Sequence, residues 1–393
     1  MNHDRWIEDK IAQLRQDNLW RSLRSIESIP LGRATIDGKE IVLLGSNNYL
    51  GLSAHPQVIE AANNALTEFG TGSSGSRLTT GNLNLYTKLE RKIASLKQTE
   101  AAIVFSSGYL ANIGVIPALA VEGDLILSDE LNHASIIDGC RLSKARKSIY
   151  LHSDLNHLEH LLKDASGYQH RWIITDGIFS MDGDIASLPD IYDLACQYNA
   201  RLIVDDAHGL GILGKKGSGT VEHFGLSQNQ DIIQTGTLSK AVGGLGGYVA
   251  ASKNLVELLI NQARSFIFST GLPPATLAAA TTAVDIIRSC ASVRQNLLKN
   301  AQNLQNALLQ NGFDFLPNET QIIPLIIGPA KQALHFSEVL FEHGVYAPAI
   351  RPPTVPEGTS RLRMSVIASH TENDIKKVIQ ALIASRTAVD KLH

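Results

Sequence analysis

The sequence predicts an α/β protein, in which a mostly parallel sheet is covered by helices and is accompanied by a smaller α+β unit. The first observation is a series of short apolar runs separated by helical stretches, at 101–107, 124–129, 147–152, 171–177, 201–207, 231–237 and 246–252. Runs that are apolar on both faces are typical of parallel strands buried on both sides. The second observation is a change in the order of the elements after about residue 290, which indicates a second unit.

Length and composition agree with a folded protein of two main parts. The chain has 393 residues, of which 44% are hydrophobic and 19% are charged. It can therefore bury a large core, and this balance excludes a disordered chain. We expect an N-terminal arm and hairpin at 1–45, a large domain at 46–290 and a small C-terminal α+β domain at 291–393.

Charge and cysteine content exclude several classes of function. The net charge of −3, from 35 basic and 38 acidic residues, lacks the basic excess typical of nucleic-acid binding. The apolar stretches are interrupted by polar residues and glycine, so we expect no membrane span. Three widely spaced cysteines fit a reducing compartment, and the charged first residues argue against a signal peptide. We therefore expect a cytoplasmic protein that binds neither nucleic acid nor a membrane.

The N-terminal elements can be predicted in order. Residues 1–30 are predicted to form an amphipathic helical arm, and Asp37-Gly38 between two apolar runs is a β-hairpin turn signal. Pro56 suits the first turn of a helix. The spacing of leucine and isoleucine at 85–96 predicts the next helix.

Beyond residue 290, helices and strands alternate in a compact α+β unit. The pattern predicts helices at 292–311 and 331–344, and strands at 313–316, 321–328, 345–350 and 361–367. A last helix is predicted to begin at Thr371, where Asp374 three residues later completes a capping-box pattern.

Residues at the carboxyl ends of the predicted strands are the candidates for chemistry, because open parallel sheets bind ligands there. One strand is followed by Gly108, which opens a helix whose N-terminus suits an anion. Another ends near Asp205, and a third is followed by Lys240 among hydroxyl residues and glycines. A lysine can form an imine with a carbonyl cofactor, and an aspartate can keep a pyridine nitrogen protonated. Together these residues predict a site for pyridoxal 5'-phosphate (PLP).

Simpler interpretations compete with each of these signals. Taken singly, Lys240 and Asp205 fit a solvated loop lysine and a helix cap, because structural charges far outnumber catalytic ones. The glycines at 209–214 match a G-x-G-x-x-G pattern, but neither a helix opening nor a suitably placed acidic residue follows them. The histidines at 152–160 have helical spacing, so we expect a solvated helix face there and no metal site. A P-loop pattern is absent from the sequence.

Eight ordered motifs, spread over essentially the whole chain, closely resemble those of the α-oxoamine synthase family. They are SNNYLGL (46–52), GTGSSGSRLTTG (70–81), SSGYLAN (106–112), SDELNHASIIDG (128–139), DGIFSMDGD (176–184), VDDAHG (204–209), TGTLSKAVGG (235–244) and IRPPTVPEGTSRLR (350–363). The resemblance implies a fold-type I PLP-dependent transferase. Its mostly parallel sheet would be covered by helices, and a smaller α+β C-terminal domain would follow.

The resemblance also implies a role for each matching residue around the cofactor. Lys240 would hold PLP as an imine and move the α-proton of the substrate, Asp205 would pair with the pyridine nitrogen, and His208 would bond the ring hydroxyl. His133 would stack on the ring, although a histidine in isolation is more often a satisfied core residue. The further cofactor contacts would be Gly108, Tyr109, Ser180, Thr237 and Ser239, together with Ser269 and Thr270, which would reach the partner subunit's phosphate in a homodimer.

On the substrate side, the resemblance implies that Arg363 binds the amino-acid carboxylate, since a guanidinium group can hold a carboxylate with two parallel hydrogen bonds. Arg361 lies on the same face of the predicted strand, so one of the two could be merely supporting. The amino-acid pocket would be bordered by Asn47, Ser76 and His133, and the acyl side by Arg21 and Thr354.

The motif at 350–363 most resembles the members of the family that serve biotin biosynthesis. The implied reaction joins L-alanine to a pimeloyl thioester of coenzyme A or acyl-carrier protein, and releases CO2 and 8-amino-7-oxononanoate. One alternative is another α-oxoamine synthase, of the glycine C-acetyltransferase or serine palmitoyltransferase type. A catalytically silent subunit of a lipid-synthesising complex is a second alternative, which the intact Lys240, Asp205 and His133 oppose. An NAD-dependent oxidoreductase built on the glycines at 209–214 is the third.

Overall fold

The computed structural model describes residues 4–29 and 31–390. Residues 1–3 and 30 of the predicted arm, and residues 391–393 of the predicted C-terminal domain, lie outside the described residues. The chain divides into two compact units. The large unit comprises Asn47–Ser180 and Asp184–Gln295, and the small unit comprises the residues up to Ser46, Met181–Gly183 and the residues from Asn296 onward.

A single sheet forms the centre of the large unit. Within the described residues it has seven strands in the order β3-β9-β8-β7-β6-β4-β5. Their bounds are β3 Ala101–Phe105, β4 Leu125–Asp129, β5 Arg146–Tyr150, β6 Arg171–Asp176, β7 Arg201–Asp205, β8 Ile233–Thr237 and β9 Gly247–Ala251. β9 runs antiparallel to both of its neighbours, whereas the other pairs are parallel. The prediction of a mostly parallel sheet is confirmed.

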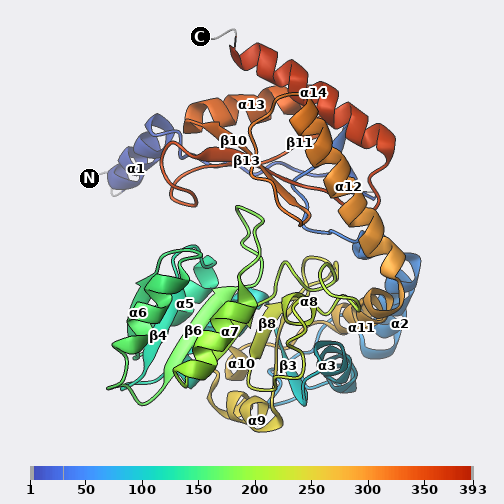
Figure 1. Cartoon of the computed structure of the whole chain (residues 1–393). Coiled ribbons are helices and arrows are strands. Elements are labelled where there is room, and N and C mark those ends of the chain that lie inside the picture. The colour runs from blue at the N-terminus through green and yellow to red at the C-terminus, as the bar shows by residue number, and fades with distance from the viewer. Residues whose placement is uncertain (1–3, 30, 391–393) are drawn as a thin grey trace. The chain divides into compact units, whose positions relative to one another are not determined.

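Helices cover this sheet on both faces, which explains the continuous apolar runs (Figure 1). Alternate strand residues such as Ile174 and Ile203 pack on one side, in a cluster that contains buried residues of α4, α5, α9 and α10. Their neighbours Ile173 and Leu202 pack on the other side with α6, α7 and α8. The bounds are α4 Gly108–Leu119, α5 Ala134–Leu142, α6 Leu155–Lys163, α7 Leu188–Gln197, α8 Thr220–His223, α9 Lys253–Gln262 and α10 Arg264–Ile267. Both faces of each central strand are therefore dry.

The remaining helices of the large unit pack together at one side of it. They are η1 Leu52–Ala54, α2 Pro56–Phe69, α3 Asn84–Lys97 and α11 Pro274–Ser289, and α11 packs against both α2 and α3. Pro56 occupies the first turn of α2, as predicted. α12, Ala291–Gln310, begins in this unit and continues into the small one.

Two small sheets and their helices build the small unit. One sheet has the order β1-β2-β11 and the other β10-β13-β12. The elements are α1 Arg5–Gln16, β1 Arg33–Ile36, β2 Lys39–Leu43, β10 Ile322–Gly328, α13 Ala330–Glu342, β11 Val345–Tyr346, β12 Ala349–Ile350, β13 Ser360–Ser365 and α14 Glu372–Asp390. The hairpin of β1 and β2 is confirmed, and Asp37 and Gly38 both have the positive φ that a tight two-residue turn requires.

Three local predictions in this unit can be compared with the structure. The strand predicted at 313–316 is wrong, because the segment contributes only an isolated bridge between Phe315 and Leu325. The strand predicted at 345–350 is divided into β11 and β12, which belong to different sheets. The capping box is confirmed: the Asp374 carboxylate accepts from the Thr371 amide at 2.8 Å, and Thr371 Oγ1 accepts from the Asp374 amide at 3.2 Å.

The apolar stretches were expected to lack a membrane span. Among the helices that the structure describes, none combines the length and the apolar character needed to cross a bilayer.

Candidate active site

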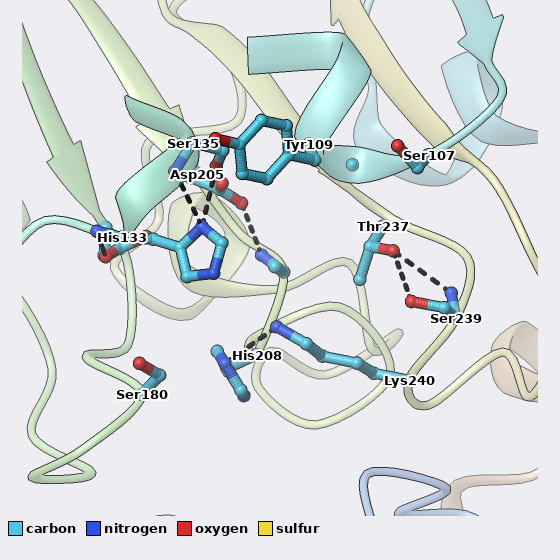
Figure 2. A pocket seen from close by; sticks show the side chains of 13 residues that line it. Ser107, Tyr109, His133, Ser135, Ser180, Asp205, His208, Thr237, Ser239 and Lys240 are labelled. Carbon is cyan, nitrogen blue, oxygen red and sulfur yellow. Dashed lines mark hydrogen bonds between the residues drawn. The ribbon is translucent and has the colours of Figure 1, made fainter. Parts of the chain in front are cut away.

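A cavity of about 260 Å³ lies at the carboxyl ends of the central strands of the large unit. Its lining comes from the starts of α4 and α5 and from the segments after β6, β7 and β8 (Figure 2). The lining residues are Ser107, Gly108, Tyr109, His133, Ser135, Asp176, Ser180, Asp205, Ala207, His208, Thr237, Ser239 and Lys240. Strand ends thus bring a lysine amine, two histidines and two carboxyl groups into one hollow.

Lys240 projects into this cavity beside His208. Its Nζ lies 2.7 Å from His208 Nε2, and the other ring nitrogen of His208 lies 2.7 Å from the Tyr49 hydroxyl. Tyr49 Oη in turn donates to Asn47 Oδ1 at 3.0 Å. The lysine amine is therefore held at the end of a hydrogen-bonded chain that reaches back to the first motif of the large unit.

Asp205 ends β7 as an almost fully buried carboxylate. One oxygen accepts from Asn112 Nδ2 at 2.6 Å, and the other accepts from the Ala207 amide at 2.9 Å. Its neighbour across the sheet is Asp176, whose carboxylate accepts from the His133 amide at 2.8 Å. Burial, with the nearby charge of Asp205, raises the pKa of Asp176 well above its usual value. The protonated form of Asp176 is therefore favoured more than it is for an exposed carboxyl group.

His133 precedes α5 and caps it through its own ring. Its Nδ1 accepts from the Ser135 amide at 3.2 Å and lies 2.7 Å from the Ser135 hydroxyl. Part of the ring faces the open cavity, yet the protein behind it desolvates the imidazole and lowers its pKa. The charge of Lys240 acts in the same direction, whereas Asp205 opposes it. The neutral ring is therefore favoured.

The start of α4 and the end of β8 make the anion-binding side of the cavity. Ser107 caps α4 by accepting from the Leu110 amide at 3.1 Å. A Cβ on Gly108 would lie 3.0 Å from the Thr237 side chain, so glycine permits the helix start to approach β8 closely. The Thr237 and Ser239 hydroxyls are 2.7 Å apart. A helix N-terminus with two hydroxyl donors suits a phosphate group.

These features together fit PLP. The lysine amine can bind its aldehyde carbon, the buried Asp205 carboxylate can hold its ring nitrogen protonated, and the α4 end suits its phosphate. Among the described residues, no group of three or more His, Cys, Asp or Glu side chains could hold a metal ion.

Comparison with known proteins decides the family. The family model for aminotransferase class I and II matches residues 39–382. The chain belongs to this family. The 8-amino-7-oxononanoate synthase of Geobacter sulfurreducens is 50% identical over 96% of this chain and 97% of its own length. The 8-amino-7-oxononanoate synthase 2 of Bacillus subtilis is 48% identical, with 97% of each chain covered.

Solved structures place the chain in the α-oxoamine synthase branch of the class I and II family. A serine palmitoyltransferase from Sphingomonas wittichii has a TM-score of 0.92 and 32% identity, covering 98% of both chains. The 8-amino-7-oxononanoate synthase of Francisella tularensis has a TM-score of 0.76 and 28% identity, covering 90% of this chain and 99% of that one. The predicted family and its fold-type I transferase fold are thereby confirmed.

The structure brings most of the predicted cofactor residues together, while others lie elsewhere. The cavity lining contains Gly108, Tyr109, His133, Ser180, Asp205, His208, Thr237, Ser239 and Lys240. Ser76 and Thr270 face each other across an isolated bridge outside this lining, next to Ser269. Arg21, Thr354 and Arg363 belong to the small unit.

Four residues that line the cavity are absent from the site predicted from the sequence: Ser107, Ser135, Asp176 and Ala207. Asn112 was missed too, although it bonds Asp205 directly. A signal was present for two of them. Asn112 lies four residues after Gly108, which is one helical turn, and Ser135 lies two residues after His133 at a helix start.

The expectation of a solvated helix face at 152–160 is wrong for His152. This residue precedes α6, and its ring is held between Asp129 at 3.1 Å and Asp184 at 3.0 Å. It also packs edge-on against Phe179, with ring centroids 4.3 Å apart. Because Phe179 and Asp184 flank Ser180 in the chain, His152 anchors the segment that carries this cavity residue.

His152 is expected to stabilise the protein at neutral pH and to lose this effect in alkali. Burial alone would lower the pKa of its ring, but the bonds and charges of Asp129 and Asp184 prevail and raise that pKa to about 10. A pKa raised above its unfolded value contributes fully below about pH 6.5, and the contribution disappears as the pH rises through 10. We expect His152→Gln to lower the free energy of unfolding by ~2 kcal/mol at pH 6, as for hydrogen bonds to charged groups.

Urea unfolding of the two proteins at pH 6 and pH 10.5 measures this difference. The matched control is His160→Gln, because His160 and its partner Asp164 are both exposed and should change little. A His152→Gln difference of the same size at both pH values would contradict the assignment.

Proposed function

We propose that this chain is a PLP-dependent C-acyltransferase that condenses L-alanine with a pimeloyl thioester. The products would be 8-amino-7-oxononanoate, CO2 and the free thiol of the acyl carrier, a step of biotin biosynthesis. One observation carries the choice of substrates: proteins named 8-amino-7-oxononanoate synthase are 48–50% identical to the chain over nearly its full length. The scattered cysteines support a cytoplasmic location for the reaction.

The cavity supports the chemistry that this reaction needs. PLP supplies an electron sink that stabilises negative charge at the carbon next to the substrate nitrogen. Asp205 would hold the ring nitrogen protonated, His208 would bond the ring hydroxyl, and His133 would lie on the ring face. The phosphate would be bound by Gly108, Tyr109, Thr237 and Ser239, with Ser180 as a further contact.

Lys240 would have two successive tasks. Its Nζ would hold the cofactor covalently before alanine binds, and its amine would then be available as a base. The freed amine removes the proton from Cα of alanine and later returns a proton to the same carbon after CO2 has left. His208, 2.7 Å from Nζ, keeps the amine in reach of the cavity. The Cα of alanine would attack the thioester carbonyl carbon, and the carrier would leave as a thiolate with the electron pair of the C–S bond, taking up a proton to become the free thiol.

A homodimer completes the proposal for the cofactor phosphate. Ser269 and Thr270 would reach the phosphate bound by the partner subunit. The segment that carries these two residues is held by contacts with two other segments. Thr270 forms an isolated bridge with Ser76, and its carbonyl accepts from Ser106 Oγ at 3.0 Å. On the substrate side, Asn47, Ser76 and His133 would border the amino acid, and Arg21 and Thr354 the acyl chain.

Arg363 is the proposed clamp on the alanine carboxylate, and Arg361 a supporting residue. Within the small unit, Arg361 forms an ion pair with Asp182, and both arginine side chains are buried on the same face of β13. We expect Arg363→Lys to raise the KM for L-alanine ~10-fold, since a lysine cannot form two parallel bonds to a carboxylate. Steady-state kinetics with alanine as the varied substrate measures this.

Arg361→Lys is the matched control for that substitution. It should shift the KM for alanine less than about twofold, because its partner is a protein carboxylate, while lowering thermal stability. The reverse pattern, with the larger KM effect at Arg361, would assign the clamp to Arg361.

A matrix of amino acids against acyl thioesters tests the proposed function. L-alanine, glycine and L-serine are each combined with pimeloyl-CoA, pimeloyl-acyl-carrier protein, acetyl-CoA and palmitoyl-CoA, and CO2 release is followed. We expect the highest kcat/KM for alanine with one of the pimeloyl donors, and the two donors identify the carrier. Faster turnover of glycine with acetyl-CoA, or of serine with palmitoyl-CoA, would overturn the proposal. The second outcome is the main alternative, since a serine palmitoyltransferase structure with bound PLP shares the fold at a TM-score of 0.93.

A further inference from the structure

A chain of hydrogen-bonded polar side chains connects two residues of the cavity lining, Asp205 and His133. It runs from Asp205 through Asn112 and Ser135 to His133, and Thr235 joins it at Asn112. Asn112, Ser135 and Thr235 are each at most 1% exposed. Such groups keep their native geometry only if every donor finds an acceptor, so the protons in the chain can be assigned.

Asp205 decides the orientation of the Asn112 amide. Its Oδ2 is 2.6 Å from Asn112 Nδ2, and an ionised carboxylate can only accept. A flipped amide would place a carbonyl oxygen against the carboxylate, which is repulsive. The second proton on Nδ2 goes to Ser135 Oγ at 2.9 Å, and Asn112 Oδ1 accepts from Thr235 Oγ1 at 2.9 Å. Every polar atom of the Asn112 side chain therefore has a partner.

The proton of Ser135 follows from this arrangement. Its hydroxyl oxygen already accepts from Asn112, and its own proton points to His133 Nδ1, 2.7 Å away. The backbone amide of Ser135 donates to the same ring nitrogen at 3.2 Å. A nitrogen that receives two donors carries a lone pair and no proton.

We infer that Asn112 and Ser135 are positioning residues that hold His133 in the tautomer with its proton on Nε2, and that connect this ring to the Asp205 carboxylate. Figure 2 shows the ring nitrogen bonded to Ser135 and the other nitrogen pointing away from it. His133 Nε2 then carries the ring proton, so it can only act as a donor and cannot accept a proton. In the proposed function, on which this last consequence rests, proton removal from the substrate is left to Lys240.

The lowered pKa of His133 agrees with this assignment, because a neutral ring is required for a single defined tautomer. Asn112 also donates one of the two hydrogen bonds that the Asp205 carboxylate accepts, and the Ala207 amide donates the other. A change at Asn112 should therefore affect both the carboxylate and the imidazole, whereas a change at Ser135 should affect the imidazole alone. This difference separates the inference from a general loss of packing.

Nuclear magnetic resonance of protein labelled with ¹⁵N-histidine measures the tautomer directly, without substrate and both with and without PLP. The His133 signals are identified by their loss in His133→Asn. We expect Nδ1 to resonate as an unprotonated ring nitrogen and Nε2 as a protonated one at pH 7.5. A protonated Nδ1 in the unmodified protein would overturn the inference without need of any variant, and it would leave the proposed reaction untouched.

Two variants then test the positioning roles. Ser135→Ala and Asn112→Leu should each bring the two ring shifts of His133 toward each other, as a mixture of tautomers does. Ser385→Ala is the matched control, since this buried serine bonds the Ala381 carbonyl in the small unit and should leave the shifts unchanged. Unchanged shifts in both Ser135→Ala and Asn112→Leu would contradict the inference.

Binding of PLP, followed by its absorbance, provides the second readout. Asn112→Leu should weaken PLP ~10-fold, because Asp205 loses a charge-assisted bond. Ser135→Ala should weaken PLP less than Asn112→Leu does, because Asp205 keeps both of its hydrogen bonds, while still altering the His133 shifts. Equal losses of PLP affinity in the two variants would show a merely structural effect and overturn the separation of roles.

Discussion

Lys240→Ala is expected to abolish turnover, with a fall in kcat of at least ~10³-fold, because the residue serves both as the covalent anchor and as the base. The cavity itself should persist, since neighbouring groups hold one another: His208 bonds Tyr49, and Asp205 bonds Asn112. We therefore expect the same melting temperature within about 2 °C. Product formation, and borohydride trapping of the cofactor on the protein, measure the two tasks separately.

Lys253→Ala is the matched control for this substitution, because its side chain is exposed on α9 and 3.9 Å from Glu257. It should retain full activity and leave a borohydride-trapped adduct on Lys240. Turnover by Lys240→Ala near that of the unmodified protein, or trapping at another lysine, would show that the covalent site lies elsewhere.

Lys97→Met is expected to have the largest effect on stability. Lys97 Nζ is fully buried, donating to Asp206 Oδ2 at 2.6 Å and to the Ser218 carbonyl at 2.5 Å. Removing one partner of a buried ion pair leaves the other charge without compensation and costs ~3–5 kcal/mol. Asp206 directly follows Asp205 and also accepts from the Thr220 amide and hydroxyl. The loss should therefore also weaken PLP binding.

Urea unfolding measures this cost, and the same helix α3 offers a matched control. Lys92 forms an exposed ion pair with Asp285, so Lys92→Met should change the free energy of unfolding by less than ~1 kcal/mol. Adding Asp206→Asn to Lys97→Met should recover part of the loss, because the second change removes the uncompensated charge. A Lys97→Met effect as small as that of Lys92→Met would contradict the buried pair.

Packing around Asp206 explains why this pair has little room to adapt. A Cβ on Gly219, whose φ is +113°, would lie 1.7 Å from Asp206 Oδ2, and one on Gly209 would lie 2.0 Å from Oδ1. The carboxylate is thus enclosed by backbone that only glycine allows. Part of the glycine content of the segment after β7 serves this enclosure rather than a dinucleotide.

The limits of prediction from sequence are clearest where the local pattern was weak. Residues 313–316 have an apolar pattern that suits a strand, but Phe315 forms only an isolated bridge there. His152 was assigned to a helix because histidines recur near it, whereas its partners Asp129 and Asp184 are 23 and 32 residues away. Hydrogen bonds between such distant residues leave no periodic signal.

Local sequence patterns predict the mostly parallel sheet, the hairpin at Asp37-Gly38 and the places of Lys240 and Asp205 after strands, while the family resemblance adds His133. These depend on local patterns: buried apolar runs, turn residues and short motifs. Only the tertiary structure revealed the chain from Asp205 through Asn112 to His133, and the pair of Lys97 with Asp206. Asn112 and Asp205 are 93 residues apart, and Lys97 and Asp206 are 109 apart. Folding alone brings them together, and burial gives their hydrogen bonds and charges their energetic effect.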